Sequence, residues 1–172
     1  MSDLSGLYQE LILDHSRRRL GDGELAEPHA THHELNPTCG DEITMGIHLD
    51  ASGTVLEAIG WTGDGCSISM ASASALTELA TGADLDRVRA LVDEFRSMMR
   101  SKGAGEANEE LLGDAIAFHG VSKYVMRVKC AMLAWVALEA CVAAASASNP
   151  ASASNPASAT GAITDRGDSS AR

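Results

Sequence analysis

A thiol and a carboxylate stand close together in the first quarter of the chain. Cys39 and Asp41 are separated only by Gly40, within the segment Asn-Pro-Thr-Cys-Gly-Asp at residues 36–41. Pro37 disfavours helical angles at the residue before it, and Gly40 accepts backbone angles that a side chain forbids, so we expect a tight bend here. A bend can direct both side chains to one point. A thiolate and a carboxylate so placed could bind a metal ion, and the thiolate could also act as a nucleophile.

Two further cysteines are candidates for the same site. Cys66 follows Gly-Asp-Gly, and Cys130 follows Arg-Val-Lys. Together with Cys39 and Asp41 they would supply three thiolates and one carboxylate, which fill a closed tetrahedral zinc shell with Zn–S distances of about 2.3 Å. None of the cysteines forms a C-x-x-C pair, so the spacing alone does not specify zinc.

The remaining cysteine and the histidines compete for the same role. Cys141 lies three helical turns from Cys130, roughly 16 Å at the helical rise, so it cannot share a metal with Cys130 and is interpreted as a core thiol. His32 and His33 are adjacent on a predicted strand and point to opposite faces, so at most one could join the site, and we expect neither as a ligand. His119, shortly before the last predicted helix, is a candidate for handling protons.

Two basic residues flank the third candidate cysteine. Arg127 and Lys129 could hydrogen-bond the thiolates of a net anionic site from outside the ligand shell. They could equally be ordinary charges on the surface of a helix. The residues alone leave both interpretations open.

The composition limits the possible partners. The chain has 172 residues, 24 of them acidic and 13 basic, and its formal net charge is -11. Phosphate backbones and anionic membrane surfaces would repel such a chain, so neither nucleic acid nor a membrane is an expected partner. A protein partner with a basic docking surface fits the charge better.

The apolar segments predict a cytoplasmic protein. The first ten residues have no basic region ahead of an apolar core, so no secretory signal is predicted. The longest apolar tract, residues 131–145, is interrupted by Glu139 and is too short to cross a bilayer. In a reducing compartment, four cysteines are interpreted as thiols or metal ligands rather than as disulfides.

The apolar spacing predicts a domain over residues 1–145 that mixes strands and helices. The predicted strands lie at residues 31–35, 42–49 and 54–61. The predicted helices lie at residues 4–15, 66–82, 84–101, 111–118 and 127–145. An antiparallel hairpin of the second and third strands would bring Cys39 and Cys66 to the same end of the sheet. Cys66 would then lie at a helix N-terminus, where backbone N–H groups favour a negative charge.

The last 27 residues differ in composition from the rest of the chain. Within residues 146–172 the segment Ser-Asn-Pro-Ala-Ser-Ala occurs twice in succession, at 148–153 and 154–159. This repeat has no large apolar side chain with which to build a core. We therefore expect a disordered, low-complexity tail.

Three motifs in this order carry a resemblance to a known family. They are Asn-Pro-Thr-Cys-Gly-Asp at 36–41, Gly-Asp-Gly-Cys-Ser-Ile-Ser-Met-Ala-Ser-Ala-Ser at 63–74, and Gly-Val-Ser-Lys followed by Arg-Val-Lys-Cys-Ala-Met-Leu-Ala-Trp within 120–135. The chain resembles the SufU branch of the IscU/NifU-type iron–sulfur assembly proteins from about residue 7 to residue 142. The resemblance implies an α+β fold, a small antiparallel sheet of about three strands packed by five to six helices, which agrees with the predicted elements.

The resemblance also implies an activity and a set of residues. It implies a zinc-dependent sulfurtransferase that accepts sulfur from a SufS-type cysteine desulfurase and serves downstream Suf assembly proteins. Carried over by position, the zinc ligands are Cys39, Asp41, Cys66 and Cys130, and Cys39 is also the sulfur acceptor. Lys129 stands where IscU-type scaffolds carry histidine, and the Leu-Pro-Pro-Val-Lys segment of those scaffolds does not occur in this sequence.

The chain departs from the family pattern at two places. Asp14-His15 is followed by Ser-Arg-Arg-Arg where the family often has a proline-containing run, and Val125 stands where proline is common. Neither place carries a candidate ligand. These departures bear on the fit to a partner protein and not on the metal.

Two other functions are compatible with the same residues, and a third is not. A scaffold could assemble a [2Fe–2S] cluster on the four candidate ligands, and a purely structural zinc site could use them as well. A zinc hydrolase would need an open coordination position and a general base, which three cysteines and an aspartate do not leave. The resemblance favours sulfur transfer among these functions.

Overall fold

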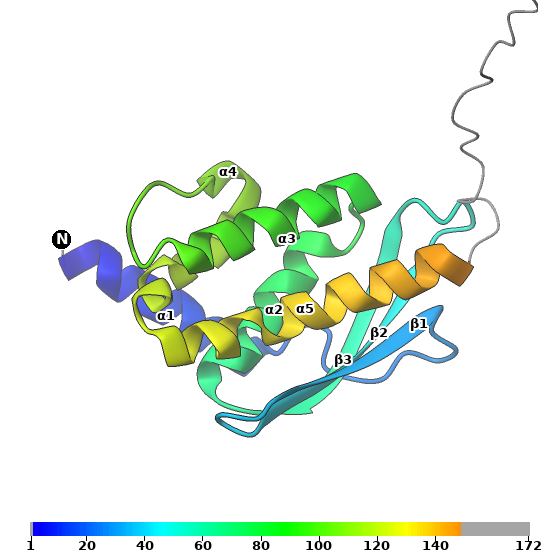
Figure 1. Cartoon of the computed structure of the whole chain (residues 1–172), viewed down its shortest axis with the longest axis horizontal. Coiled ribbons are helices and arrows are strands. Elements are labelled where there is room, and N and C mark those ends of the chain that lie inside the picture. Colours follow the sequence, from blue (N-terminus) through cyan, green and yellow to red (C-terminus); the bar gives the residue numbers. More distant parts are fainter. Residues whose placement is uncertain (1, 149–172) are drawn as a thin grey trace, which may run out of the picture.

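The computed structural model describes residues 2–148 as an α+β domain in which a three-stranded sheet packs against helices (Figure 1). This confirms the predicted fold class. The elements are α1 (Ser2–Arg18), β1 (Ala30–Asn36), β2 (Asp41–Leu49), β3 (Leu56–Asp64), α2 (Ser67–Ala80), α3 (Leu85–Arg100), α4 (Glu109–Leu112), the 3₁₀ helix η1 (Gly113–Lys123) and α5 (Val125–Ser148).

The sheet is an antiparallel meander in the order β1-β2-β3. At one end Asn36 pairs with Asp41 across β1 and β2, while Glu42 pairs with Asp64 across β2 and β3. The bend after β1 and the segment after β3 therefore lie at the same end of the sheet, as the predicted hairpin required. The alternation predicted for β2 is confirmed, because every second residue, including Met45, is buried.

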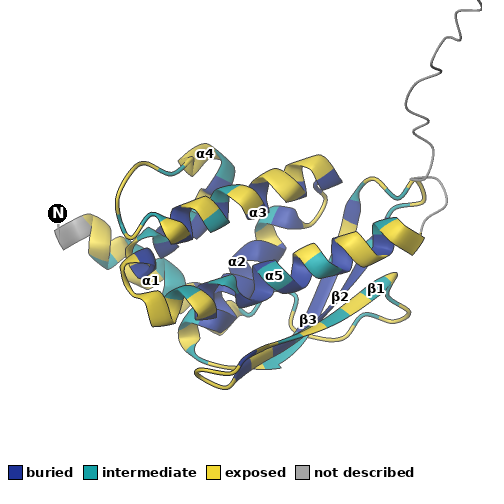
Figure 2. Ribbon diagram, viewed as in Figure 1, coloured by how far each residue is buried: buried dark blue, intermediate teal, exposed yellow. Residues whose placement is uncertain are grey.

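Two helices cover the sheet and form the centre of the molecule. The long helix α5 crosses the sheet, where it contacts β1 and β2, and it also packs against α2 (Figure 1). Helix α2 is buried along nearly its whole length (Figure 2), which its run of serine and alanine permits because small side chains allow close approach. The Ser72 hydroxyl donates a hydrogen bond to the Ala131 carbonyl at 2.6 Å and accepts one from Trp135 Nε1 at 2.9 Å.

Helix α5 is longer than the apolar tract seen in the sequence. By length and composition alone it could cross a membrane, but 56% of its most apolar window is buried inside the structure. Its Trp135 ring stacks on Phe95 of α3 with centroids 4.0 Å apart. These contacts make α5 the core helix of this domain.

Several predicted boundaries differ from the observed ones. Helix α1 continues past the predicted end to Arg18, where Arg18 forms ion pairs with Asp14 and with Glu78 of α2. The helix predicted at residues 111–118 is split into α4 and η1, because Gly113 at φ +48° interrupts the helical backbone. Helix α5 includes residues 146–148, and the remainder of the predicted tail, 149–172, lies outside the described residues.

Candidate metal centre

The bend expected at residues 37–40 is present and is held by two hydrogen bonds. Gly40 has a φ of +75°, which glycine adopts without strain, and its N–H donates to the Asn36 carbonyl at 2.8 Å. The Asn36 side-chain oxygen accepts the Thr38 N–H at 3.1 Å. This leaves Cys39 exposed on the bend, while Asp41 at the start of β2 is buried.

The bend brings Cys39 and Asp41 to Cys130 in the first turns of α5. The Cys39 and Cys130 sulfurs are 3.4 Å apart, and these two sulfurs and an Asp41 carboxylate oxygen all lie within 4.8 Å of one another. Two thiolates on one tetrahedral zinc ion, with bonds of about 2.3 Å, stand about 3.8 Å apart. The donor atoms therefore fit a shared metal ion in both chemistry and spacing.

Cys66 adjoins this group at the N-terminus of α2, as the sequence predicted. It is the N-cap residue of the helix, and its N–H donates to Asp41 Oδ1 at 3.3 Å. Its sulfur lies 3.5 Å from the Ser69 hydroxyl oxygen and does not belong to the tight group of three. Three of the four predicted ligands thus lie close together, and the fourth, Cys66, contacts this group through its hydrogen bond to Asp41.

The Asp41 carboxylate is arranged to stay ionised. Burial opposes its charge, but hydrogen bonds from Ser69 and from the thiols of Cys39, Cys66 and Cys130 hold the pKa of Asp41 below its ordinary value. The Ser69 hydroxyl donates to Asp41 Oδ2, and the carboxylate also faces the N-terminus of α2, whose dipole favours an anion. An ionised carboxylate is the form that coordinates a cation.

The surroundings of Cys130, in contrast, favour its neutral, protonated thiol. Burial raises the pKa of Cys130 to about 12, with further increases from its hydrogen bond to Cys39 and from the negative charge of Cys66. Crowded, buried thiolates repel one another, so a positive charge among them is needed for all to ionise near neutral pH. A divalent cation supplies such a charge.

Three residues that shape the site were not identified from the sequence. Ser69 anchors Asp41, Asn36 donates from Nδ2 toward the Cys130 sulfur at 3.9 Å, and Gly65 allows the chain to pass against Asp41. A Cβ atom on Gly65 would lie 2.9 Å from the Asp41 carboxyl carbon, closer than real contacts allow. Of the three, only Asn36 could have been identified from the sequence, because asparagine before proline is typical of turns.

The competing histidines are occupied elsewhere. His32 contacts Glu34 at 2.8 Å, and His33 contacts Thr44 at 2.9 Å, both on the sheet. His119 lines a groove beside α1 rather than the thiol cluster. That neither strand histidine is a ligand stays a prediction.

The other residues weighed from the sequence are also placed. Cys141 is fully buried in the core and donates to the Met45 carbonyl at 3.3 Å, as expected of a core thiol. Arg127 and Lys129 are exposed, and within residues 2–148 no hydrogen bond joins either side chain to a thiol. Their role beside the ligands stays a prediction.

Comparison with known proteins agrees with this geometry. Residues 7–131 match the family described as the NifU-like N terminal domain. The chain is 39% identical over 138 residues to the zinc-dependent sulfurtransferase SufU of Bacillus subtilis (strain 168), covering 80% of this chain and 90% of that protein. It is 37% identical over 139 residues to the iron–sulfur cluster assembly scaffold protein IscU of Streptococcus pyogenes serotype M1, covering 81% of this chain and 84% of that protein.

A solved structure shares the fold. The iron–sulfur cluster assembly scaffold protein for the SUF system from Fervidobacterium islandicum AW-1 superposes with a TM-score of 0.71 at 32% identity, covering 77% of this chain and 94% of that one. The family match spans the bend, α2 and the start of α5, and so includes every residue of the thiol and carboxylate cluster. The chain therefore belongs to the NifU-like N-terminal domain family, among the IscU/SufU-like proteins of iron–sulfur cluster assembly.

Proposed function

We propose that this protein is a zinc-dependent sulfurtransferase that takes persulfide sulfur from a SufS-type cysteine desulfurase onto Cys39. One observation carries the assignment of the acceptor. Among the clustered thiols, Cys39 is exposed, Cys66 is partly buried and Cys130 is 1% exposed. The thiol on the bend is therefore the most accessible of the three to a sulfur atom held on another protein.

The proposed zinc ligands are Cys39, Asp41, Cys66 and Cys130. Zinc, when bound, supplies the positive charge that keeps these thiols deprotonated at neutral pH. The similarity to a zinc-dependent sulfurtransferase of Bacillus subtilis supports this metal. The protein's own contribution is to hold Asp41 ionised through Ser69 and the start of α2.

The transfer step is an exchange between sulfur atoms. The Cys39 thiolate attacks the outer sulfur of the desulfurase persulfide, a new S–S bond forms on Cys39, and the desulfurase cysteine leaves as a thiolate. The outer sulfur keeps its proton, so no oxidant or reductant is consumed. The sulfur then passes to downstream Suf assembly proteins. We place the reaction in the cytoplasm, where thiols stay reduced.

The experiment combines the zinc-loaded protein, the desulfurase of the same organism and cysteine. Alanine production gives the turnover, and mass spectrometry locates the added sulfur on each cysteine. We expect faster turnover and a label on Cys39, with both lost in Cys39→Ser and both kept in Cys141→Ser. Full-rate labelling of Cys66 or Cys130 in Cys39→Ser would reject the assignment.

A scaffold that assembles a [2Fe–2S] cluster is the second candidate. It is favoured by the similarity to the IscU scaffold of Streptococcus pyogenes and by an exposed sulfur at the edge of the cluster. Anaerobic reconstitution with iron and sulfide separates the two functions. A stable cluster that transfers to an apo-protein supports the scaffold, whereas zinc that resists displacement supports sulfur transfer.

A further inference from the structure

A second group of side chains able to bind a metal lies where α1, α2 and η1 pack against one another. It consists of His15 in the last turn of α1, Glu78 in α2 and Asp114 at the start of η1. One ligand atom from each of these residues lies within 4.8 Å of the other two. Neither the thiol cluster nor the proposed sulfur transfer uses any of the three.

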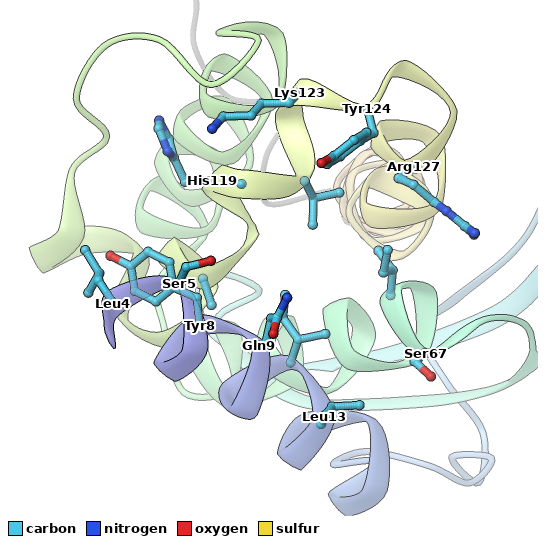
Figure 3. Close-up of a pocket in the computed structure, with 15 residues that line it drawn as sticks. Leu4, Ser5, Tyr8, Gln9, Leu13, Ser67, His119, Lys123, Tyr124 and Arg127 are labelled. Carbon is cyan, nitrogen blue, oxygen red and sulfur yellow. The ribbon is translucent and has the colours of Figure 1, made fainter. Parts of the chain in front are cut away.

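This group is separate from the thiol site and from the groove beside α1. Cys66 and Glu78 are 12 positions apart, a distance of about 18 Å at the helical rise. Figure 3 shows the groove, whose α1 wall runs from Leu4 to Leu13, and none of its lining residues belongs to the group of three. An ion bound by this group would therefore share no ligand with zinc at the thiols.

The imidazole of His15 is buried and directed at both carboxylates. Its ring is 1% exposed, and Nε2 lies 3.4 Å from Asp114 Oδ2 and 3.6 Å from Glu78 Oε2. Hydrogen bonds from N–H to oxygen usually span about 2.7–3.2 Å, so both contacts are long. Two ligands of one tetrahedral zinc ion, with bonds of about 2.1 Å, stand about 3.4 Å apart. The spacing of Nε2 from the two oxygens thus fits ligands of one ion better than hydrogen bonds.

The other nitrogen of the ring is held by Ser74. Nδ1 lies 3.0 Å from the Ser74 hydroxyl oxygen, which also accepts the N–H of Leu20 at 3.1 Å. A hydroxyl oxygen has two lone pairs, so it can also accept from Nδ1–H, and Nε2 then carries the lone pair that binds a metal. Histidines that bind metals almost always have such a partner on the second nitrogen, and it fixes the orientation of the ring.

The charges around this group favour a divalent cation. Arg18 pairs with Asp14 at 3.4 Å and with Glu78 Oε1 at 3.2 Å. Together with Asp114 these side chains carry three negative charges and one positive charge, which leaves two negative charges beside a neutral imidazole. Since Arg18 contacts Oε1, the Oε2 atom of Glu78 remains available to an ion. The Glu78 and Asp114 side chains are 43% and 45% exposed, so an ion can enter from solvent.

We propose that His15, Glu78 and Asp114 form a second metal site, which binds a divalent transition-metal ion such as zinc and ties α1 to α2 and η1. One imidazole nitrogen and two carboxylates suit this class of ion, because imidazole prefers zinc and its neighbours to Mg²⁺ or Ca²⁺. The alternative is an ion pair in which a protonated His15 bridges the two carboxylates. The proposal does not depend on sulfur transfer, because the group includes none of the thiol-site ligands.

Calorimetric titration of zinc into protein that already holds one zinc equivalent tests the site. We expect the unmodified protein to bind a second equivalent. Asp114→Asn should raise the dissociation constant for that equivalent at least about tenfold, since even the loss of an outer partner of a ligand costs about that much. Asp86→Asn makes the same change of charge on α3, at a side chain that is 94% exposed. It should change the dissociation constant less than about twofold, because solvent and salt screen such a distant charge.

The histidine supplies a signal that needs no variant. In nitrogen-15 NMR of the protein with one zinc equivalent, the second equivalent should shift Nε2 of His15 and leave His32 and His33 unchanged. Hydrogen exchange of the α1 amides should slow at the same equivalent, because an ion that binds only the folded state stabilises the elements it joins. Glu78→Gln should weaken both effects, and it replaces Asp114→Asn if that variant does not fold.

Several results would overturn the proposal. One is that no second equivalent binds, and another is that Asp114→Asn and Asp86→Asn bind it equally well. A shift at His32 or His33 in place of His15 would locate the second zinc on the surface of the sheet. A protonation of His15 that added zinc does not alter would assign the group to the ion pair. None of these results changes which cysteine receives sulfur, so the proposed function is tested separately.

Discussion

The Asp41 carboxylate accepts a hydrogen bond from the backbone N–H of Cys66 at 3.3 Å, across 25 positions of the chain. This bond joins the first residue of β2 to the N-terminus of α2. It places the carboxylate where the helix dipole favours its charge and where a metal ion would meet both residues. The site is therefore organised around Asp41 as much as around the thiols.

The hydroxyl of Ser69 should control metal affinity through Asp41. In Ser69→Ala the hydrogen bond to Asp41 Oδ2 is lost, the effect of burial is offset less completely, and the pKa of Asp41 rises. Loss of such an outer partner should weaken zinc binding between about 10-fold and 100-fold. Zinc should also be released at a higher pH on acidification, because protons compete more strongly. Competition with a chromophoric chelator measures both effects.

Ser67→Ala is the matched control for that experiment. Ser67 lies in the same helical turn and is exposed. Its removal should leave zinc affinity and the pH of release unchanged. Equal zinc affinity in the two alanine variants would show that Ser69 does not support the ligand.

The close approach at Gly65 should tolerate no side chain. In Gly65→Ala the new Cβ would lie 2.9 Å from the Asp41 carboxyl carbon, so Asp41 or the chain must move. We expect a loss of about 1–3 kcal/mol in the free energy of unfolding and faster zinc loss. Gly120→Ala is the control, since its Cβ would meet nothing within 4 Å. Urea unfolding of both zinc-loaded variants measures the change in the free energy of unfolding. A Gly65→Ala variant as stable as Gly120→Ala would contradict the expectation.

The core thiol Cys141 should make stability depend on pH. Burial raises the pKa of Cys141 from 9.0 to about 11, and a backbone hydrogen bond from His32 offsets only part of that effect. Since the folded pKa lies above the unfolded one, this stabilising contribution is complete below about pH 9 and is lost as the pH rises through 11. The loss amounts to about 2 to 3 kcal/mol.

Comparison with Cys141→Ala isolates that contribution. The difference in the free energy of unfolding between the two proteins should be constant below pH 9. Above pH 9 the unmodified protein should lose stability relative to Cys141→Ala. Chemical denaturation at several pH values measures it on zinc-loaded samples. A difference that stays constant to pH 11 would show that the thiol does not titrate with the raised pKa.

His15 should hold α1 onto the domain. Its ring is 1% exposed, Nδ1 lies 3.0 Å from the Ser74 hydroxyl, and Nε2 lies 3.4 Å from Asp114. His15→Leu removes both contacts of the buried ring, and the loss should lower the free energy of unfolding by about 1–3 kcal/mol. His33→Leu, on an exposed part of β1, should change it by less than about 0.5 kcal/mol. Similar thermal midpoints for the two variants would refute this role.

The sequence by itself determined the local features of the protein. Alternation of apolar residues predicted β2, helical spacing predicted α2 and α3, and the Pro37 and Gly40 pair predicted the bend that carries Cys39. These features follow from backbone preferences and periodicity, which act over a few residues. The convergence of Cys39 and Cys66 at one end of the sheet also followed, because the antiparallel pairing of β2 with β3 dictates it.

Only the tertiary structure decided what surrounds the ligands. Ser69 is one serine among several in α2, and nothing in its neighbours marks it as the donor to Asp41. The exposure of Cys39 and the burial of Cys130 depend on how α5 crosses the sheet. The groove likewise exists only because α1 packs beside η1. Packing between segments far apart in the chain sets these features, and local sequence patterns do not encode it.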